Sequence, residues 1–239
     1  MEKSEITNPN NARNLIVQTL RDKSVHKQEV FSKTKDVFKQ LKTTLLEVHN
    51  DLLQRTQEEG VRLHFNYQEK GDFEVAFAFA GDTLIFHMHT NVFNFDRSNA
   101  IWKTTYVKEN ENRAYCGVIN IYNFLTDSFK YNREQDIGYL IARIFINHEK
   151  HYFVEGKRQL GFLYNDFANA TIDTSSLTRI IESAVLYSLD FDLLTPGYDQ
   201  VKQVSVQEIY AHSESLQQRT GKRMGFLFQA DNDDLTGNL

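Results

Sequence analysis

Proline, cysteine and tryptophan are scarce in this chain, which contains two, one and one of them, respectively. Because proline interrupts helices and central strands, so low a proline content indicates long, unbroken elements. The single cysteine, Cys116, cannot form an internal disulfide, which fits a reducing compartment. Cys116 also lies in a predicted strand, where we expect a buried, inert thiol rather than a nucleophile. We therefore expect a cytoplasmic protein.

Long hydrophobic runs and an excess of basic charge are also missing. No window approaches the roughly 18 apolar residues that span a bilayer, and the polar residues 1–11 do not resemble a secretion signal. The formal net charge of -5 disfavours a general nucleic-acid-binding role. The sequence contains neither a glycine-rich phosphate loop nor a Gly-x-Ser-x-Gly elbow, so it does not indicate one of the usual nucleotide enzymes.

Hydrophobic residues make up 41% of the chain and charged residues 25%, which is typical of globular proteins. A chain of 239 residues is long enough to bury a core in one large domain or two small ones. No linker, repeat or low-complexity tract requires a second domain. We expect a single α+β domain over residues 1–239, with residues 1–13 and 231–239 as disordered tails.

A long amphipathic helix is expected from Ser24 to Glu58, because this segment has no glycine or proline and ends just before Gly60. Its apolar stripe is wider than a coiled-coil seam, so we favour packing on the protein's own sheet over a coiled coil. Seven basic and three acidic residues lie between Arg21 and Lys42. We interpret them as a solvated helix face, with contact to RNA, an acidic protein or a membrane surface as the alternative.

Three antiparallel strands are expected between Val61 and Thr90, where large and small residues alternate. Turns at Lys70-Gly71 and Gly81-Asp82 would place small residues opposite large ones across both hairpins. The expected pairs include Phe65 with Ala76, Ala76 with His87, and Glu74 with His89. Both faces of this sheet are apolar and need cover. We therefore predict an α+β fold in which an antiparallel β-meander sheet is packed between the long N-terminal helix and C-terminal helices.

The rest of the chain is assigned from apolar spacing and turn signals. A second hairpin is expected over residues 102–108 and 113–122, and a third over residues 151–154 and 160–164. Apolar residues at helical spacing predict a helix from Arg133 to Asn147. Two more helices are expected, one from a cap at Ser175 or Ser176 to Leu194, and a last one over residues 201–219.

The sharpest candidate site is a metal site formed by Glu74, His87 and His89. The expected register places these side chains on one sheet face, with Glu74 directly opposite His89. Two imidazoles and a carboxylate are a ligand set that binds divalent metals and leaves coordination positions open for substrate. The reading we favour is structural, with a cross-strand pair of Glu74 and His89 and a hydrogen-bonded His87 over Ala76.

Three further motifs have simpler structural explanations. Gly81 followed by His87-x-His89 resembles the opening of the cupin metal motif, but the glutamate expected next is absent, so no family is assigned. The cluster from His148 to His151 has the wrong spacing for the zinc-protease signature and fits the last turn of a helix. Glu155-x-Lys157 has the residue types of a Mg²⁺-binding nuclease motif, but it flanks Gly156 in an expected turn.

The sequence favours a non-enzymatic cytoplasmic protein that acts as a protein-interaction or ligand-binding domain, with a homodimer among the expected assemblies. This preference follows from a sheet with two apolar faces, a long helix and weak catalytic patterns. The first alternative is a metal-dependent small-molecule enzyme that uses Glu74, His87 and His89 with a divalent metal. The second alternative is nucleic-acid binding through the basic N-terminal helix. We expect no other cofactor and no membrane partner.

Overall fold

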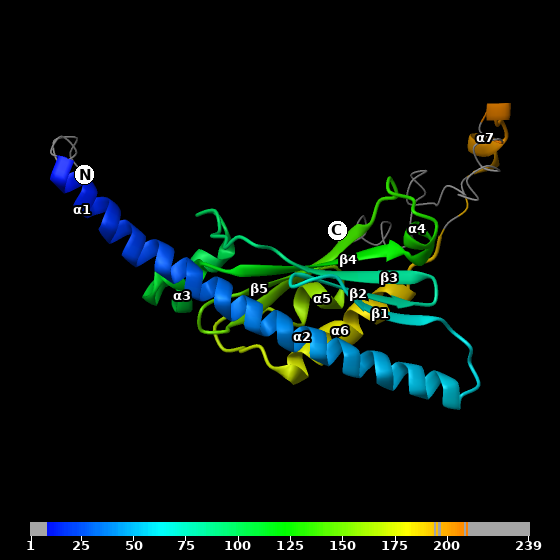
Figure 1. The fold of residues 1–239 in the computed structure, drawn as a ribbon, viewed down its shortest axis with the longest axis horizontal. Helices are drawn as coiled ribbons and strands as arrows, with labels where there is room; N and C mark the ends of the chain where they lie inside the picture. The colour runs from blue at the N-terminus through cyan, green and yellow to red at the C-terminus, as the bar shows by residue number, and fades with distance from the viewer. Residues whose placement is uncertain (1–8, 194, 196, 208, 210–239) are drawn as a thin grey trace.

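The computed structural model describes residues 9–193, 195, 197–207 and 209, and its centre is a six-stranded antiparallel sheet (Figure 1). Each strand pairs with the next one along the chain, so the sheet is a simple meander. The strands are β1 (Phe65–Glu69), β2 (Glu74–Phe79), β3 (Asp82–Met88), β4 (Gly117–Leu125), β5 (Tyr139–Ile146) and β6 (Tyr152–Gly156). The predicted α+β class and antiparallel meander are confirmed.

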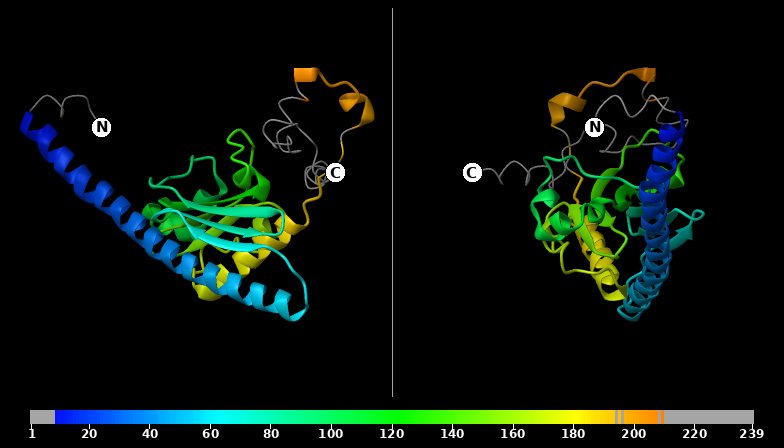
Figure 2. Two further views of the ribbon diagram at one scale, coloured as in Figure 1. Left: turned by 45° about the vertical axis from the view of Figure 1, so that its right-hand side comes forward. Right: turned by 90° about the vertical axis from the view of Figure 1, so that its left-hand side faces the viewer.

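One long helical rod runs along the sheet and extends beyond it (Figures 1 and 2). The rod consists of α1 (Pro9–Thr19), a π-helical segment η1 (Leu20–Ser24) and α2 (Val25–Glu58). Gly60, at a φ of 73°, follows its end as the sequence predicts. The expected long helix is therefore confirmed, whereas residues 9–13, expected in a disordered tail, belong to α1. The other expected tail residues, 1–8 and 231–239, lie outside the described residues.

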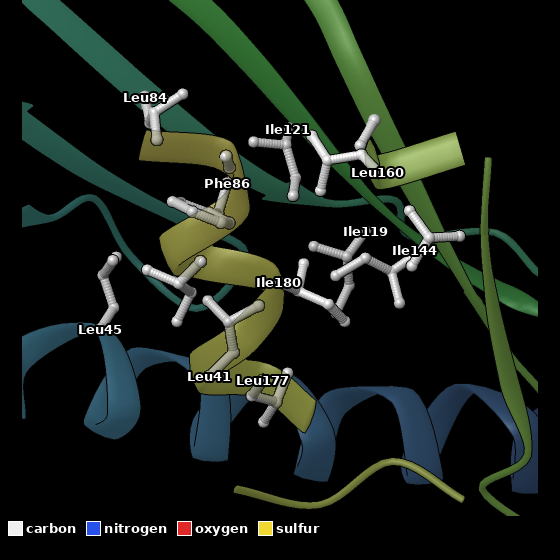
Figure 3. Packing of buried hydrophobic residues seen from close by; sticks show 14 of the residues in the cluster. Leu41, Leu45, Leu84, Phe86, Ile119, Ile121, Ile144, Leu160, Leu177 and Ile180 are labelled. Atoms are coloured by element: carbon white, nitrogen blue, oxygen red, sulfur yellow. The ribbon is translucent and has the colours of Figure 1, made fainter. Parts of the chain in front are cut away.

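Both long helices pack against the same face of the sheet (Figure 3). α2 contributes Leu41 and Leu45, and α6 (Thr174–Leu189) contributes Leu177 and Ile180. The strands complete this core with large side chains, among them Phe77, Leu84, Phe86, Met88, Ile119, Ile121 and Ile144. The helix stripe thus packs on its own sheet as expected, but the sheet does not lie between the helices. The physical reason is that the largest apolar side chains of β2, β3 and β4 all point to one side.

The first two hairpins differ in register from the expectation. β2 and β3 turn at Ala80-Gly81, so Glu74 pairs with His87 rather than with His89. A shift of two residues keeps each side chain on its predicted face, because strand side chains alternate with a period of two. In β1 the shift is odd, and Phe65 pairs with Phe79 instead of Ala76. Phe65 therefore points toward the helices.

The segment expected to form a hairpin with β4 is helical. Residues 102–108 fall in η2 (Ala100–Lys103) and α3 (Thr105–Glu109), and η3 (Glu111–Ala114) follows. Each of these short helices is capped by a side chain that accepts a backbone hydrogen bond, and the caps are Asn99, Thr104 and Asn110. Local capping therefore outweighs the apolar alternation that suggested strands.

β5 replaces the helix expected from Arg133 to Asn147. A β-bulge interrupts its pairing with β4 and leaves Ile141 and Ala142 both buried on the helix side. Ile144 follows on that same side. The bulge thereby breaks the period of two and produces an apolar spacing that imitates a helix.

The remaining elements agree in part with the expectation. β6 is a strand as predicted, but it pairs with β5, and Leu160 belongs to the short helix α5 (Gln159–Phe162). α6 begins behind Asp173, which forms a reciprocal capping box with Ser176, and it ends at Leu189 rather than Leu194. The helix expected over residues 201–219 is contradicted at its start: Val201 ends the short helix α7 (Tyr198–Val201), and residues 202–205 are not helical. Residues 208 and 210–219 of that expected helix lie outside the described residues.

Candidate ligand site on the outer face of the sheet

The face of the sheet that points away from α2 and α6 is only partly covered, and we call it the outer face. A second apolar cluster covers one end of it, with residues from η2, α3, β4, β5 and the segment around Phe167. Buried Cys116 belongs to this cluster, and burial raises the pKa of its thiol far above the ordinary value. Cys116 is therefore the inert thiol that the sequence predicts. The described residues leave the rest of the outer face open.

A line of polar residues crosses the outer face from β2 to β6. Each member is the direct cross-strand partner of the next, so all five side chains point to the same side. The members of this polar row are Glu74, His87, Asn120, Arg143 and Glu155. A continuous polar line on a sheet with this much apolar surface costs stability unless its members find partners.

The two ends of the polar row are ion pairs. Lys70 Nζ lies 3.4 Å from a carboxylate oxygen of Glu74. At the other end, Arg143 Nε donates to Glu155 at 2.7 Å, and one of its terminal nitrogens contacts the same carboxylate oxygen. Both pairs are partly exposed, so each contributes little to stability. Their effect is to fix the charged side chains of the row in place.

The middle of the polar row lacks such partners. Within the part of the chain that the structure describes, the side chains of His87 and Asn120 form no hydrogen bond or ion pair. Asn120 is only 9% exposed, and its side chain lines a cavity. Buried amides in native proteins are nearly always hydrogen-bonded. The partner of the Asn120 amide must therefore come from the cavity.

The cavity beside Asn120 has a volume of about 690 Å³. Polar-row members Asn120, Arg143 and Glu155 line it on the sheet, and a loop that carries Phe93 and Asp96 lines it from above. Its remaining lining is mixed. The apolar and aromatic side chains are Phe95, Val118, Tyr122, Leu140, Phe145, Phe153 and Val154, and the polar ones are His89, Asn94, Asn99 and Asn165. This size and this mixture of apolar walls with a few polar groups are typical of small-molecule sites.

A second hollow adjoins the first on the outer face. It measures about 360 Å³ and is lined by Glu74, His87 and aromatic side chains from β4 and α4 (Thr126–Lys130). Tyr122 lines both hollows. The polar row therefore runs from one hollow into the other.

Two local features of the backbone shape the larger cavity. The β-bulge in β5 turns Leu140 to the outer face, where it pairs with Tyr122. At the end of β6, a Cβ atom on Gly156 would lie 2.9 Å from Leu160 Cβ and 3.0 Å from Ala142 Cβ. Only glycine fits there without displacing α5, which borders the cavity at Gly161.

The predicted metal trio is brought together only in part. Glu74 and His87 are cross-strand neighbours, and His89 lies beyond the end of β3 in the larger cavity. His89 Nδ1 accepts a hydrogen bond from the backbone N–H of Asn91 at 3.0 Å, and its ring packs edge-on against Phe93. Among residues 9–193, 195, 197–207 and 209, no group of three His, Cys, Asp or Glu side chains could hold a metal ion. The metal site therefore stays a prediction.

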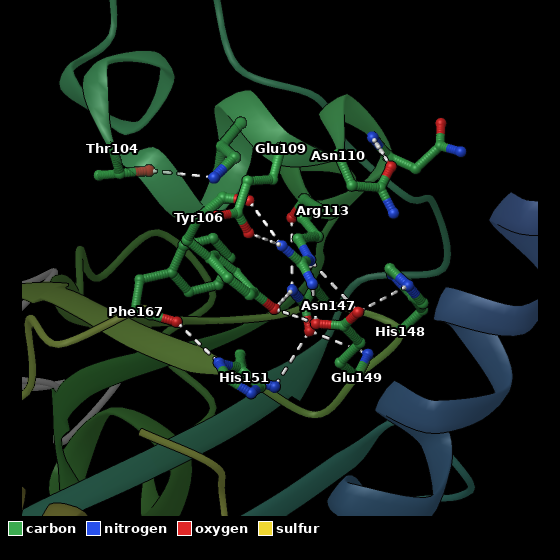
Figure 4. A network of polar contacts seen from close by, with 12 residues as sticks. Thr104, Tyr106, Glu109, Asn110, Arg113, Asn147, His148, Glu149, His151 and Phe167 are labelled. Atoms are coloured by element: carbon green, nitrogen blue, oxygen red, sulfur yellow. Dashed lines mark hydrogen bonds and ion pairs between the residues drawn. The ribbon is translucent and has the colours of Figure 1, made fainter. Parts of the chain in front are cut away.

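The cluster from His148 to His151 lies in the connection between β5 and β6, not at a helix end, and belongs to a polar network (Figure 4). We call it the buried network because Tyr106 and Asn147 at its centre are buried, although Glu149 is exposed. Tyr106 donates to Glu149 at 2.5 Å, and Arg113 Nε donates to the same carboxylate at 3.2 Å. Asn147 Nδ2 donates to the Tyr106 hydroxyl at 2.8 Å. The network ties α3 and η3 to the sheet, so its role is structural.

Hydrogen bonding sets the charge state of this network. Burial acts to raise the pKa of Glu149, but the hydrogen bonds from Tyr106 and Arg113 and the charge of Arg113 outweigh it and lower this pKa. The pKa of Tyr106 is raised by burial and by its hydrogen bond to Glu149. Burial and the neighbouring His26 lower the pKa of His148. Glu149 is therefore ionised and Tyr106 protonated at neutral pH.

Two other motifs also have structural roles. Glu155 and Gly156 lie in β6 rather than in the expected turn, and Glu155 is bound to Arg143. On the basic helix, Lys35 pairs with Asp72 at 2.7 Å, and Lys42 with Glu69 at 2.8 Å. These two lysines therefore attach α2 to the β1–β2 hairpin instead of facing a free surface.

Sequence reasoning missed Asn120 and Arg143, the central residues of the candidate site. Asn120 lies between Ile119 and Ile121, and Arg143 was assigned to a helix, so neither shows a local motif. The only available signal was a few polar residues in apolar strands: Asn120 and Asn123 in β4, and Arg143 in β5. Cross-strand pairing is needed to join them.

A comparison with models of protein families finds no match, and neither does a comparison with curated proteins or with solved structures. Among the described residues, the helices are too short or too polar to traverse a bilayer.

Proposed function

We propose that this protein is a non-enzymatic ligand-binding domain whose ligand occupies the outer-face cavity. The observation that carries the proposal is the amide of Asn120, a residue that is 9% exposed. The amide is accessible from the cavity and has no hydrogen-bond partner among the described residues. Such a group costs stability when it stays unsatisfied, and a ligand that bonds it removes that cost. Its position beside the fixed pair of Arg143 and Glu155 supports a pre-formed site.

The experiment uses Nile red, an uncharged planar dye whose emission shifts to shorter wavelength in an apolar site. The wild-type chain should bind it saturably. Leu140→Arg places a charge in the cavity wall at a side chain that is already 43% exposed, and it should weaken binding at least tenfold, roughly the effect of one unfavourable polar contact.

Leu186→Arg is the matched control. Leu186 lies on α6, is 63% exposed and does not line the cavity. This variant should bind Nile red as the wild type does. The proposal fails if the wild-type chain shows no saturable binding, or if Leu140→Arg and Leu186→Arg weaken binding equally.

Self-association is the second candidate function, and the helical arm formed by α1 and η1 favours it. The arm extends beyond the sheet (Figure 2). Its side chains Leu15, Ile16, Val17 and Leu20 are exposed. Exposed apolar side chains on one element are typical of an interaction surface. Sedimentation at increasing concentration tests this candidate, with Leu20→Lys expected to keep the protein monomeric. A wild-type chain that stays monomeric throughout would exclude it.

The cellular location forms part of the same proposal. The single, fully buried cysteine supports a reducing compartment such as the cytoplasm. Thiol labelling of Cys116 in protein isolated without reductant tests this statement. We expect an unmodified thiol that reacts with the label only after unfolding, because Cys116 is buried in the fold.

A further inference from the structure

We infer that the cavity takes an uncharged, planar organic molecule with a carboxamide-like edge, in which a hydrogen-bond donor lies beside an acceptor. The inference rests on the proposed function and names the chemical class of the ligand. Aromatic amides and heterocycles with a lactam edge belong to this class.

The hydrogen-bonding capacity of Asn120 determines which ligand edge fits. Its amide presents an acceptor oxygen and two N–H donors in one plane. A ligand edge with a donor beside an acceptor satisfies both sides in one bidentate contact, as an adenine edge does with asparagine. A purely apolar ligand would leave the amide of this 9% exposed residue unsatisfied. The amide therefore selects a ligand with a matching edge.

The charged groups of the cavity lining disfavour a charged ligand. Asp96 and Glu155 contribute two carboxylates, and Arg143 contributes one guanidinium. Ser98 donates hydrogen bonds to Asp96 from its side chain and its backbone, and these hold the pKa of Asp96 below its ordinary value. Glu155 already binds Arg143. An anion therefore meets excess negative charge, and a cation finds no free carboxylate beside Asn120 on the sheet.

The aromatic side chains of the cavity wall favour a planar ligand. The rings of Phe145 and Phe153 are stacked with their centroids 4.8 Å apart and their planes at 16°. The ring of Phe95 packs against both at a tilt, with centroid distances of 5.1 Å to Phe145 and 5.7 Å to Phe153. All three side chains line the cavity. Ring faces and edges of this kind favour contact with another planar system.

An intrinsic fluorophore, Trp102, contacts this aromatic wall and can report on ligand binding. Trp102, the single tryptophan of the chain, donates its indole N–H to the backbone oxygen of Phe95 at 3.2 Å. A ligand that contacts Phe95 should therefore change the fluorescence of Trp102.

The test compares four probes of the same ring size: benzamide, benzoate, benzylamine and toluene. Each competes with Nile red on the full chain, and Trp102 emission gives an independent readout. Benzamide should displace the dye at least tenfold more effectively than any of the other three, which corresponds to one good hydrogen-bonded contact. Asn120→Leu should abolish this preference and leave the displacement by toluene unchanged.

The possible outcomes separate the two proposals. If Nile red binds in the cavity but benzoate, benzylamine or toluene competes as well as benzamide, the ligand class is wrong and the binding function stands. If Nile red does not bind, the function itself fails. If Asn120→Leu does not fold, the ranking of the four probes on the wild-type chain alone decides, and an equal ranking overturns the inference.

Discussion

Gly117 on β4 lies directly beneath Thr34 of α2. A Cβ atom on Gly117 would come within 2.1 Å of Thr34 Oγ1 and 2.7 Å of Thr34 Cβ. Thr34 is fully buried and donates its hydroxyl hydrogen to the backbone oxygen of Val30 at 2.8 Å. The long helix therefore crosses the sheet at a contact that only glycine permits. This contact also explains why a threonine stands among the buried residues of α2, since a larger side chain would not fit at Thr34.

Substituting Gly117 by alanine should lower the free energy of unfolding by about 1–3 kcal/mol, because the added methyl group forces α2 away from β4. Urea denaturation measures the change. Gly81→Ala is the matched control, since nothing lies within 4 Å of a Cβ at that position, and its effect should stay within about 0.5 kcal/mol. Equal effects at the two sites would contradict the close contact.

Asn120 should lower the free energy of unfolding when no ligand is bound. Asn120→Leu removes an amide without a described partner and should leave the free energy of unfolding unchanged or raise it by up to about 2 kcal/mol. Asn147→Leu is the contrast, because that buried amide bonds Tyr106, Glu149 and His151, and it should cost at least about 2 kcal/mol. A large loss for Asn120→Leu would reveal a structural role instead.

The hydroxyl of Tyr106 should be essential to the buried network. Tyr106→Phe removes one hydrogen bond from Glu149 and one from Asn147 and should cost about 1–3 kcal/mol at neutral pH. Tyr198→Phe, at a side chain that is 80% exposed, should have no measurable effect in the same denaturation assay. The network would not be structural if both variants unfold at the same urea concentration as the wild type.

Glu149 should make the protein sensitive to acid. Because its pKa is lowered in the folded state, the stability it contributes is full above the pKa of an unfolded glutamate and is lost as the pH falls through the folded value. The Glu149→Gln variant should therefore show a flatter loss of stability than the wild type between about pH 7 and about pH 3. Parallel pH profiles for the two proteins would contradict this assignment.

His148 should titrate at an unusually low pH. Burial disfavours its charged form, and the charge of His26, whose ring centroid lies 4.7 Å away, adds repulsion. Neutral His148 is thus favoured in the fold, and protonation costs stability as the pH falls through the ordinary histidine range. NMR titration of the His148 ring should show a higher pKa in His26→Gln than in the wild type, and an unchanged pKa would exclude the repulsion.

The sequence predicts those parts of the fold that local signals determine. The long helix that ends just before Gly60 and the strands on both sides of Ala80-Gly81 follow from periodicity, glycine and the low proline content. Register does not, because one residue more or less in the turn before β2 moves Phe65 to the other face. The β5 bulge and the capped short helices before β4 likewise depend on details that apolar spacing does not contain.

The candidate site was less predictable than the fold. Glu74 and His87 were placed on one face correctly, because a register error of two residues preserves the face. Their importance as the end of a longer row could not be predicted, since Asn120 and Arg143 come from strands that are distant in sequence. The polar row forms only because β2, β3, β4, β5 and β6 pair side by side in this register.

The side-chain amide resonances of Asn120 report directly on whether the cavity beside it binds a ligand. We predict that titration of isotope-labelled protein with benzamide shifts the Nδ2 signals of Asn120 saturably, while those of Asn147, in the buried network, stay in place. Unchanged Asn120 signals at saturating benzamide, or equal shifts at Asn120 and Asn147, would contradict the account.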